Sequence, residues 1–185
     1  MSNITYHMIE AMKRGFLPTE RAELNNASFY SEDDLYSPTD RRNMAGHFVA
    51  SAIVLSPSHN CALMIHHKFL DRLLFPGGHI DDREDPLVAA FREVFEETGC
   101  YARPLAHHPI DFDSHDIPVN PAKGEEAHRH HDMLFLGETS DDQQLALAER
   151  EIMGARWMTL DQIAALPERR FARVVAATRR YLSSM

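Results

Sequence analysis

Two short runs of apolar and β-branched residues, separated by a turn, begin the regularly patterned part of the chain. They are HFVASAIVL at 47–55 and CALMIHH at 61–67, and the intervening SPSHN is typical of a turn. This pattern predicts a β-hairpin. A third short run at 72–75 leads into Pro76-Gly77-Gly78, where we expect a loop to begin.

The segment that follows carries the signals of a helix start and a helix stop. Asp85 is a good N-cap, Pro86 suits the first helical position, and Gly99 can adopt the left-handed conformation that ends a helix. The sequence therefore predicts a helix at 86–98. Its apolar side is expected to carry Leu87, Val88, Phe91, Val94 and Phe95.

Short strands and loops alternate through the rest of the chain, which ends in a helical pattern. The expected elements are strands at 101–112, 129–136 and 154–158, a long Pro-containing loop at 113–127, a short helix capped by Thr159, and an amphipathic helix at 168–182. This order of strands and helices predicts a mixed α/β layered domain.

The first 43 residues lack this regular pattern. We therefore expect an N-terminal extension at 1–43 and a single domain at 44–185. The extension contains a helix-like stretch at 4–14 and a polar, acidic segment around 31–40. We expect it to be helical and to pack either on the domain or on a partner chain. A homodimer is therefore one of the expected possibilities.

Composition and charge narrow the class of protein. At 185 residues with 44% hydrophobic content, the chain suits one globular domain with a sizeable core. A formal net charge of −9 disfavours binding to nucleic acid or anionic lipid, which depends on clustered Lys and Arg. No apolar run approaches the roughly 18 residues that span a bilayer, and the first residues do not resemble a secretory signal. We expect a cytoplasmic protein with a small-molecule substrate, in which Cys61 and Cys100 are reduced packing residues.

Three glutamates on the predicted helix indicate its chemistry. Glu93, Glu96 and Glu97 lie at i, i+3 and i+4, so they share one helix face. Carboxylates packed this closely repel one another unless a cation compensates, and hard divalent ions prefer oxygen ligands. A magnesium or manganese site explains the cluster, whereas a solvated acidic face is the alternative that three glutamates alone would favour.

The residues around these glutamates decide between the two interpretations. The residues concerned are Gly78, Glu84, Arg92, Glu93, Val94, Glu96, Glu97 and Gly99. With their spacing, the segment 78–100 resembles the signature of the Nudix hydrolase family, and Cys100 occupies a place that usually holds an aliphatic residue. The resemblance implies the Nudix fold, an α/β/α sandwich with a mixed central sheet. It also implies metal-dependent hydrolysis of a diphosphate linkage in a nucleoside diphosphate derivative, such as ADP-ribose or a nucleotide sugar.

The resemblance assigns metal ligands residue by residue. It implies that Glu93 and Glu97 bind Mg²⁺ or Mn²⁺ directly, that Glu96 binds the ion directly or through water, and that the Gly77 carbonyl is a further ligand. Gly77 and Gly78 are expected to let the backbone turn tightly with this carbonyl aimed at the ion, which a side chain would obstruct.

Other residues are assigned supporting and catalytic roles. The resemblance implies that Glu84 supports the metal shell and that Arg92 orients the glutamates through an ion pair, with a plain surface arginine as the alternative. Glu151, six residues before the single tryptophan, resembles a glutamate that some members supply from outside the signature. Two assignments of the general base are possible, Glu151 or a signature glutamate such as Glu93 or Glu96. Glu151 also lies in a charge run, so it is equally well explained as a solvated acid.

A histidine-rich segment follows the expected loop. His128, His130 and Asp132 alternate along a predicted strand, so they share one face, with His131 on the other. Together with His115 in the loop, we interpret them as substrate-binding residues. An additional metal site, a phosphate-binding patch and a purely structural role are the alternatives.

Competing functions are separated by the signature and its surroundings. A nucleoside triphosphate pyrophosphohydrolase and a non-enzymatic nucleotide-ligand sensor are the alternatives to the first interpretation. Sensors often carry a degraded signature and a DNA-binding domain, neither of which this sequence shows. The sequence around Cys61 does not match the cysteine setting of isopentenyl diphosphate isomerase, and the acidic net charge argues against an RNA-decapping enzyme. The hydrolase interpretation is therefore favoured.

Overall fold

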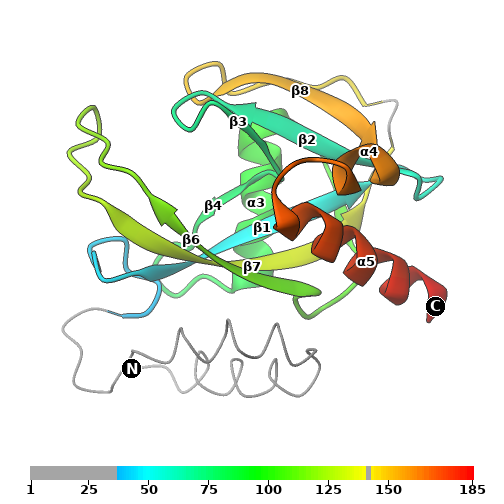
Figure 1. Ribbon diagram of the computed structural model, residues 1–185, viewed down its shortest axis with the longest axis horizontal. Coiled ribbons are helices and arrows are strands. Elements are labelled where there is room, and N and C mark those ends of the chain that lie inside the picture. Colours follow the sequence, from blue (N-terminus) through cyan, green and yellow to red (C-terminus); the bar gives the residue numbers. More distant parts are fainter. Residues whose placement is uncertain (1–36, 141–142) are drawn as a thin grey trace.

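The computed structural model describes residues 37–140 and 143–185, which form a mixed sheet with helices on both faces (Figure 1). The expected N-terminal extension lies largely outside the described residues, the helix-like stretch at 4–14 included. Its packing and the homodimer therefore stay predictions. None of the described helices combines the length and the apolar character that crossing a membrane requires.

The described part of the chain folds into strands and helices close to those expected. In chain order they are β1 (His47–Leu55), β2 (Cys61–His67), β3 (Arg72–Leu74), β4 (Gly77–His79), α3 (Pro86–Thr98), β5 (Arg103–Pro104), β6 (Asp111–Ile117), β7 (His128–Glu138), β8 (Ile152–Thr159), α4 (Leu160–Ala164) and α5 (Arg169–Ser183). All three helices expected after residue 85 are confirmed, and so is the hairpin of β1 and β2. The strands expected at 129–136 and 154–158 are confirmed with their ends moved by one or two residues.

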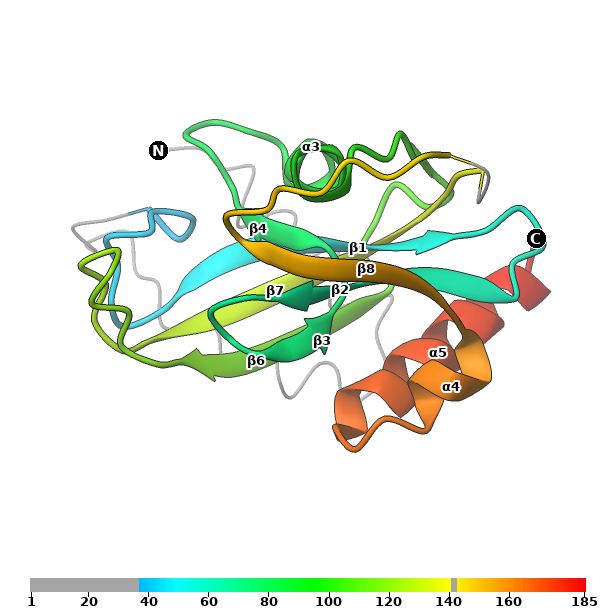
Figure 2. The same ribbon diagram turned by 90° about the horizontal axis from the view of Figure 1, so that it is seen from above.

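The helices form two layers that enclose the sheet (Figure 2). α3 covers one face, where Phe48 of the sheet belongs to one buried cluster with Ala90 and Val94 of the helix. α4 and α5 cover the other face, where Leu136 of the sheet belongs to a second buried cluster with Phe171 of α5. This arrangement confirms the predicted α/β/α sandwich with a mixed sheet.

β1 is a central strand that changes its neighbour along its length. Its C-terminal end pairs antiparallel with β2, with Leu55 opposite Ala62, whereas its N-terminal half pairs antiparallel with β4, with Val49 opposite His79. β7 runs parallel to β1 on the other side, in register along the whole strand. Residues of β1, β4 and β7 line a cleft. The cleft therefore lies at the part of β1 that pairs with β4 and not with β2.

The sequence predicts one long loop at 113–127, but the structure shows that this prediction is wrong for the first part of the segment. Its first five residues complete β6, which pairs antiparallel with β7 along its whole length. β6 has the polar sequence DFDSHDI because part of it lines the cleft and because Arg173 of α5 hydrogen bonds to Asp111 and Asp113. A polar strand of this kind lacks the apolar alternation on which strand prediction depends.

Three further expectations are corrected by the structure. The strand expected at 101–112 is interrupted, because only Arg103–Pro104 and the last two residues pair with β7. Pro109, which cannot donate to a strand ladder, lies in the gap between them. The loop expected to begin at Pro76-Gly77-Gly78 contains the short strand β4, which pairs with β1. The apolar side of α3 is narrower than expected: Leu87, Phe91 and Val94 pack against the sheet as predicted, together with Ala89 and Ala90, whereas Val88 and Phe95 are 58% and 42% exposed.

Candidate active site

The cleft has a volume of about 420 Å³ and is lined by α3 and by strands of the sheet. Its acidic wall consists of three side chains of α3, Glu93, Glu96 and Glu97. The histidine wall consists of His79, His128 and His130 of β4 and β7, which line the cleft, together with the buried His47 of β1, whose ring stacks on those of His79 and His128. The structure therefore brings the signature glutamates and the histidine-rich strand to one cleft.

α3 is fixed at both of its ends. At the N-terminal end, the Asp85 side chain accepts the Leu87 N–H at 2.8 Å. At the C-terminal end, Gly99 has a φ of 68° and donates its N–H to the Phe95 carbonyl at 2.7 Å. The predicted N-cap and left-handed C-cap are both confirmed. Because the opposite side of the helix packs on the sheet, the glutamates of the acidic wall project from a rigid element.

Glu97 is the buried member of the acidic wall, with 4% of its surface exposed. Its carboxylate accepts the Gly77 N–H at 3.0 Å. Burial raises the pKa of Glu97 to about 8; the Gly77 hydrogen bond opposes this shift, and the charges of Glu93 and Glu151 add to it. A carboxylate that is this costly to ionise is a group that a bound cation would stabilise.

Arg92 links the acidic wall to the strand beneath it. Its guanidinium donates to Glu84 at 2.8 and 2.9 Å and to the His79 carbonyl at 2.8 Å. It also donates to Glu93 at 2.8 Å and to Glu96 at 3.3 Å. The predicted ion pair is therefore present, with Glu84 holding the far side of the guanidinium. The orienting role of Arg92 and the supporting role of Glu84 stay predictions about activity.

The two glycines of β4 allow neighbouring residues to approach the β4 backbone closely, and they do not form a tight turn. A Cβ at Gly78 would lie 2.7 Å from the carboxyl carbon of Glu93, and a Cβ at Gly77 would collide with Ser51 of β1. Both glycines pair with β1 as strand residues, so the tight turn expected at this point is wrong. Glycine is needed because β4 lies directly between α3 and β1.

Glu151 reaches the same cleft from the turn that precedes β8. Lys123 donates to its carboxylate at 2.8 Å, and both side chains are about half exposed. The hydrogen bond from Lys123 lowers the pKa of Glu151. The cleft therefore contains an ionised carboxylate from outside the signature, as a general base requires, and the catalytic role of Glu151 stays a prediction.

The predicted substrate-binding residues all line the cleft; they are His115, His128, His130 and Asp132. The alternation predicted along β7 is confirmed, because His131 lies on the opposite face and stacks on Phe112 with ring planes 6° apart. Asp132 is buried and accepts the Ser51 hydroxyl at 3.0 Å through Oδ2. Its Oδ1 has no hydrogen-bond partner within the described part of the chain, so one carboxylate oxygen is left for a ligand.

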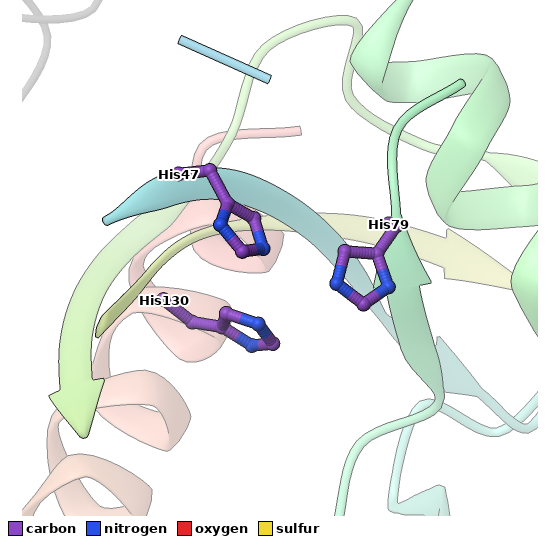
Figure 3. Close-up of side chains that lie close together, drawn as sticks. All are labelled: His47, His79 and His130. Atoms are coloured by element: carbon purple, nitrogen blue, oxygen red, sulfur yellow. The ribbon is translucent and has the colours of Figure 1, made fainter. Parts of the chain in front are cut away.

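His47 and His79 join the site without having been predicted from the sequence. The register of β1 with β4 and β7 places their rings beside that of His130, with the ligand atoms of all three within 4.8 Å of one another (Figure 3). Among the residues that the structure describes, this is the one group of three or more candidate metal ligands with such spacing. The carboxylates of the acidic wall, which accept hydrogen bonds from Arg92 and Gly77, are not spaced this closely. The sequence feature that could have indicated His79 is its position directly after two glycines.

Comparison with known proteins defines the class to which this fold and site belong. A family model described as the NUDIX domain matches residues 45–178. The chain therefore belongs to the Nudix family, and the resemblance drawn from the signature is confirmed. A solved structure of a NUDIX-family hydrolase from Clostridium perfringens has the same fold, with a TM-score of 0.58 and 21% identity over 72% of this chain and 96% of that chain.

Two curated relatives are also similar in sequence. The chain is 38% identical over 100 residues to a Lactococcus lactis subsp. cremoris protein named "Probable DHNTP pyrophosphohydrolase", a match that covers 54% of this chain and 58% of the relative. It is 34% identical over 128 residues to the "CMP-5'-(N-acetyl-N-hydroxy-3-aminopropyl)phosphonate hydrolase" of Streptomyces rubellomurinus, a match that covers 65% of this chain and 57% of the relative. The chain thus spans less than two thirds of the length of either relative.

Proposed function

We propose that this protein hydrolyses a diphosphate linkage in a nucleoside diphosphate derivative, with a divalent cation bound at the acidic wall. The observation that carries this proposal is the environment of Glu97. Its side chain is buried near Glu93 and Glu151 in the cleft, and its pKa is raised to about 8. A cation in the cleft would compensate these charges, whereas a purely structural helix gains nothing from burying a carboxylate there.

Mg²⁺ or Mn²⁺ fits the donor set of the acidic wall. The donors are the carboxylates of Glu93, Glu96 and Glu97 and the carbonyl of Gly77, and hard divalent cations prefer such oxygens. Gly78 leaves a space beside the Glu93 carboxylate that any Cβ would fill. When bound, the cation would stabilise charge on the phosphoryl oxygens and lower the pKa of a bound water.

The chain's own residues position these groups. Arg92 holds Glu93 and Glu96 by hydrogen bonds of 2.8 and 3.3 Å, and Glu84 holds Arg92. Glu151, which Lys123 keeps ionised, is our candidate for the general base that takes a proton from the attacking water. Glu93 or Glu96 is the alternative base.

The rest of the cleft suits a nucleotide derivative. Its volume of about 420 Å³ lies in the range of roughly 300–1,000 Å³ that small-molecule sites occupy. Phe69 lines the cleft with 41% of its surface exposed, so it offers an aromatic face to a base. The polar side chains of the sheet would contact a group beyond the diphosphate; they are His115, His128, His130 and Asp132. The Streptomyces rubellomurinus relative carries CMP in its name, which is in keeping with a nucleoside substrate.

Hydrolysis of a nucleoside triphosphate is the second candidate. It is favoured by the name of the Lactococcus lactis relative, which is called a pyrophosphohydrolase. Both reactions would use the acidic wall in the same way, and they differ in the group that lies beyond the cleaved linkage. The identity of the released product therefore separates them.

A substrate screen with and without metal tests the proposal. ADP-ribose, nucleotide sugars, dinucleotides and nucleoside triphosphates are incubated with the protein and Mg²⁺ or Mn²⁺, and products are detected by phosphatase or pyrophosphatase coupling. We expect a nucleoside diphosphate derivative to be cleaved to a nucleoside monophosphate, and we expect cleavage to stop in excess chelator. Release of pyrophosphate from a triphosphate as the main reaction would favour the second candidate.

A matched pair of variants completes this test. Glu97→Gln should lose turnover, whereas Glu149→Gln should keep it, because Glu149 is exposed and lies outside the cleft. Turnover that continues in excess chelator would contradict the proposal. Nucleotide binding without turnover of any substrate, with either metal, would contradict it as well and would favour the ligand-sensor alternative.

A further inference from the structure

Three histidines of the histidine wall converge on one point although they come from three strands. His47 begins β1, His79 ends β4 and His130 lies in β7. His47 is the register partner of His130 across the parallel pair, and His79 is opposite Val49, two residues along β1. All three side chains therefore lie on one side of the sheet, and Figure 3 shows their rings turned toward a common space.

The hydrogen bonds of the histidine wall leave lone pairs on ring nitrogens. His47 Nδ1 lies 3.2 Å from the Asn43 carbonyl, so it must be the donor, and Nε2 carries the lone pair. This Nε2 is buried and has no hydrogen-bond partner in the described part of the chain. Histidines that bind metal ions almost always donate their other ring N–H in this way, often to a backbone carbonyl. His47 has the tautomer of a metal ligand.

The same reasoning applies to His130 through its neighbour. His128 Nδ1 donates to the Glu126 carbonyl at 2.7 Å, so His128 Nε2 is an acceptor. It lies 3.1 Å from His130 Nε2, which is then the donor. His130 therefore keeps its lone pair on Nδ1. His128 acts as the residue that orients His130 and lies outside the group of three.

We propose that His47, His79 and His130 form a second metal site, separate from the acidic wall, that binds Zn²⁺ or another divalent transition metal. Neutral imidazole is a preferred ligand of such ions, and three histidines with an open fourth position are a known zinc arrangement. His79 and His130 line the cleft, so the open position would face a substrate. This inference does not rest on the proposed hydrolase activity.

The spacing of the ligand atoms agrees with a single ion. Zn–N bonds are about 2.1 Å long, so two nitrogens on one zinc ion lie at most about 4.2 Å apart. The ligand atoms of the three histidines already lie within 4.8 Å of one another, and small side-chain rotations would bring them into range. The ring centroids are 4.8 to 5.2 Å apart, so the three rings are direct neighbours.

The tautomers favour a metal ion over a phosphate group. The hydrogen bonds described above leave a lone pair on His47 Nε2 and on His130 Nδ1. A phosphate oxygen needs an N–H donor at these positions, whereas a ring-nitrogen lone pair can bind a metal ion. The phosphate-binding alternative is therefore disfavoured for these two residues.

Zinc binding by the full chain tests the proposal. Metal-free protein is titrated with Zn²⁺ in excess Mg²⁺ against a chromogenic chelator, and the zinc-loaded wild type is measured by X-ray absorption at the zinc edge. We expect one zinc ion per chain, with imidazole nitrogens as its protein ligands. His79→Asn and His130→Asn should each raise the Kd by more than about 100-fold, since loss of a direct ligand exceeds the 10–100-fold effect of outer-shell partners.

Two control variants separate this site from other zinc binding. His66→Asn should leave the Kd unchanged, because His66 pairs with Asp71 outside the cleft. Glu97→Gln should also leave it unchanged if the acidic wall is a separate site. Failure of wild type to bind zinc, an absorption spectrum with oxygen ligands alone, or equal loss in Glu97→Gln would each overturn the proposal. The spectrum of the wild type decides the matter even if an Asn variant does not fold.

Discussion

The acidic wall and the histidine wall face one cleft, but the chain builds them in different ways. The acidic wall comes from a single helix, where Glu93, Glu96 and Glu97 follow one another within two turns. The histidine wall takes His47, His79 and His130 from three strands that lie far apart in the sequence. The first depends on helix periodicity and capping, and the second depends on the register of β1 with β4 and β7.

The two walls also differ in charge and in ligand chemistry. Burial and mutual repulsion raise the pKa of Glu97 to about 8, and Arg92 balances its neighbours. The histidines are instead held neutral by burial, which lowers the pKa of His79 to about 3. Oxygen ligands favour Mg²⁺ or Mn²⁺ and neutral nitrogen ligands favour Zn²⁺. One cleft would thus sort two kinds of cation by the chemistry of its walls.

Removing a charge from the acidic wall is the strongest test of this division. Glu97→Gln should lower kcat/KM by about a thousandfold, or about 4 kcal/mol of barrier, because an amide cannot replace a carboxylate beside a cation. The fold should survive, since the amide oxygen can still accept the Gly77 N–H. Steady-state kinetics with Mg²⁺ and circular dichroism measure the two effects. Full activity of a folded variant would mean that the acidic wall does not carry the chemistry.

The acidic wall could be predicted from sequence because its information is local. The spacing of Glu93, Glu96 and Glu97 fixes their face, and Asp85 and Gly99 fix the helix ends, so neither depends on the rest of the fold. The α/β/α layering was predictable for a similar reason, since most apolar runs kept their lengths in the structure.

The histidine wall could not be predicted in the same way. Nothing within a few residues of His47 indicates that its partner lies in β7, because strand register is set by long-range pairing. β6 was missed because its polar side chains are balanced by Arg173 from α5, a contact that no local pattern records. The role of Gly77 and Gly78 in close packing was mistaken for a turn, since glycine suits both.

Arg173 supports the strand beside the histidine wall and offers the next test. It donates to Asp111 at 2.9 and 3.2 Å and to Asp113 at 2.9 Å, and the Asp111 side chain is 1% exposed. Arg173→Ala removes the guanidinium that pairs with the buried Asp111 carboxylate, so the free energy of unfolding should fall by about 3 kcal/mol. Urea denaturation measures this change. Arg179→Ala is the control, because its exposed pair with Asp161 should contribute under about 1 kcal/mol.

The same variant should change how stability depends on pH. Burial acts to raise the pKa of Asp113, but hydrogen bonds from His115 and Arg173 and the charge of Arg170 hold it well below its ordinary value; Asp132 is its acidic neighbour on β7. A depressed pKa means that the stabilisation is complete above the ordinary value of 3.8 and is lost as the pH falls below it. Arg173→Ala should therefore show a shallower acid slope than wild type. Parallel slopes would show that Arg173 does not hold the Asp113 charge.

Glu151 lines the same cleft as both walls, and its substitution tests whether the acidic wall supplies the general base. If Glu151 takes the proton from water, Glu151→Gln should lower kcat by about a hundredfold, or about 2.7 kcal/mol. Lys123→Met is the control, because it removes the partner at 2.8 Å and leaves the carboxylate in place. A fall in kcat of less than about threefold, or about 0.7 kcal/mol, would instead assign the base to Glu93 or Glu96.

The smallest expected effect separates binding from chemistry on the histidine wall. His128 lines the cleft and touches no group of the acidic wall in the described contacts, so it should contact the part of the substrate beyond the diphosphate. His128→Ala should raise KM by about five- to tenfold, the effect of about 1 kcal/mol of lost ring packing against the substrate, because both ring nitrogens already have hydrogen-bond partners; kcat should stay within about twofold. Such a contact is made equally in the ground and transition states, so its loss appears in KM. A loss of kcat as large as that of Glu97→Gln would place His128 in the chemical machinery, and unchanged kinetics on every substrate would make it structural; either result would contradict its proposed role in substrate binding.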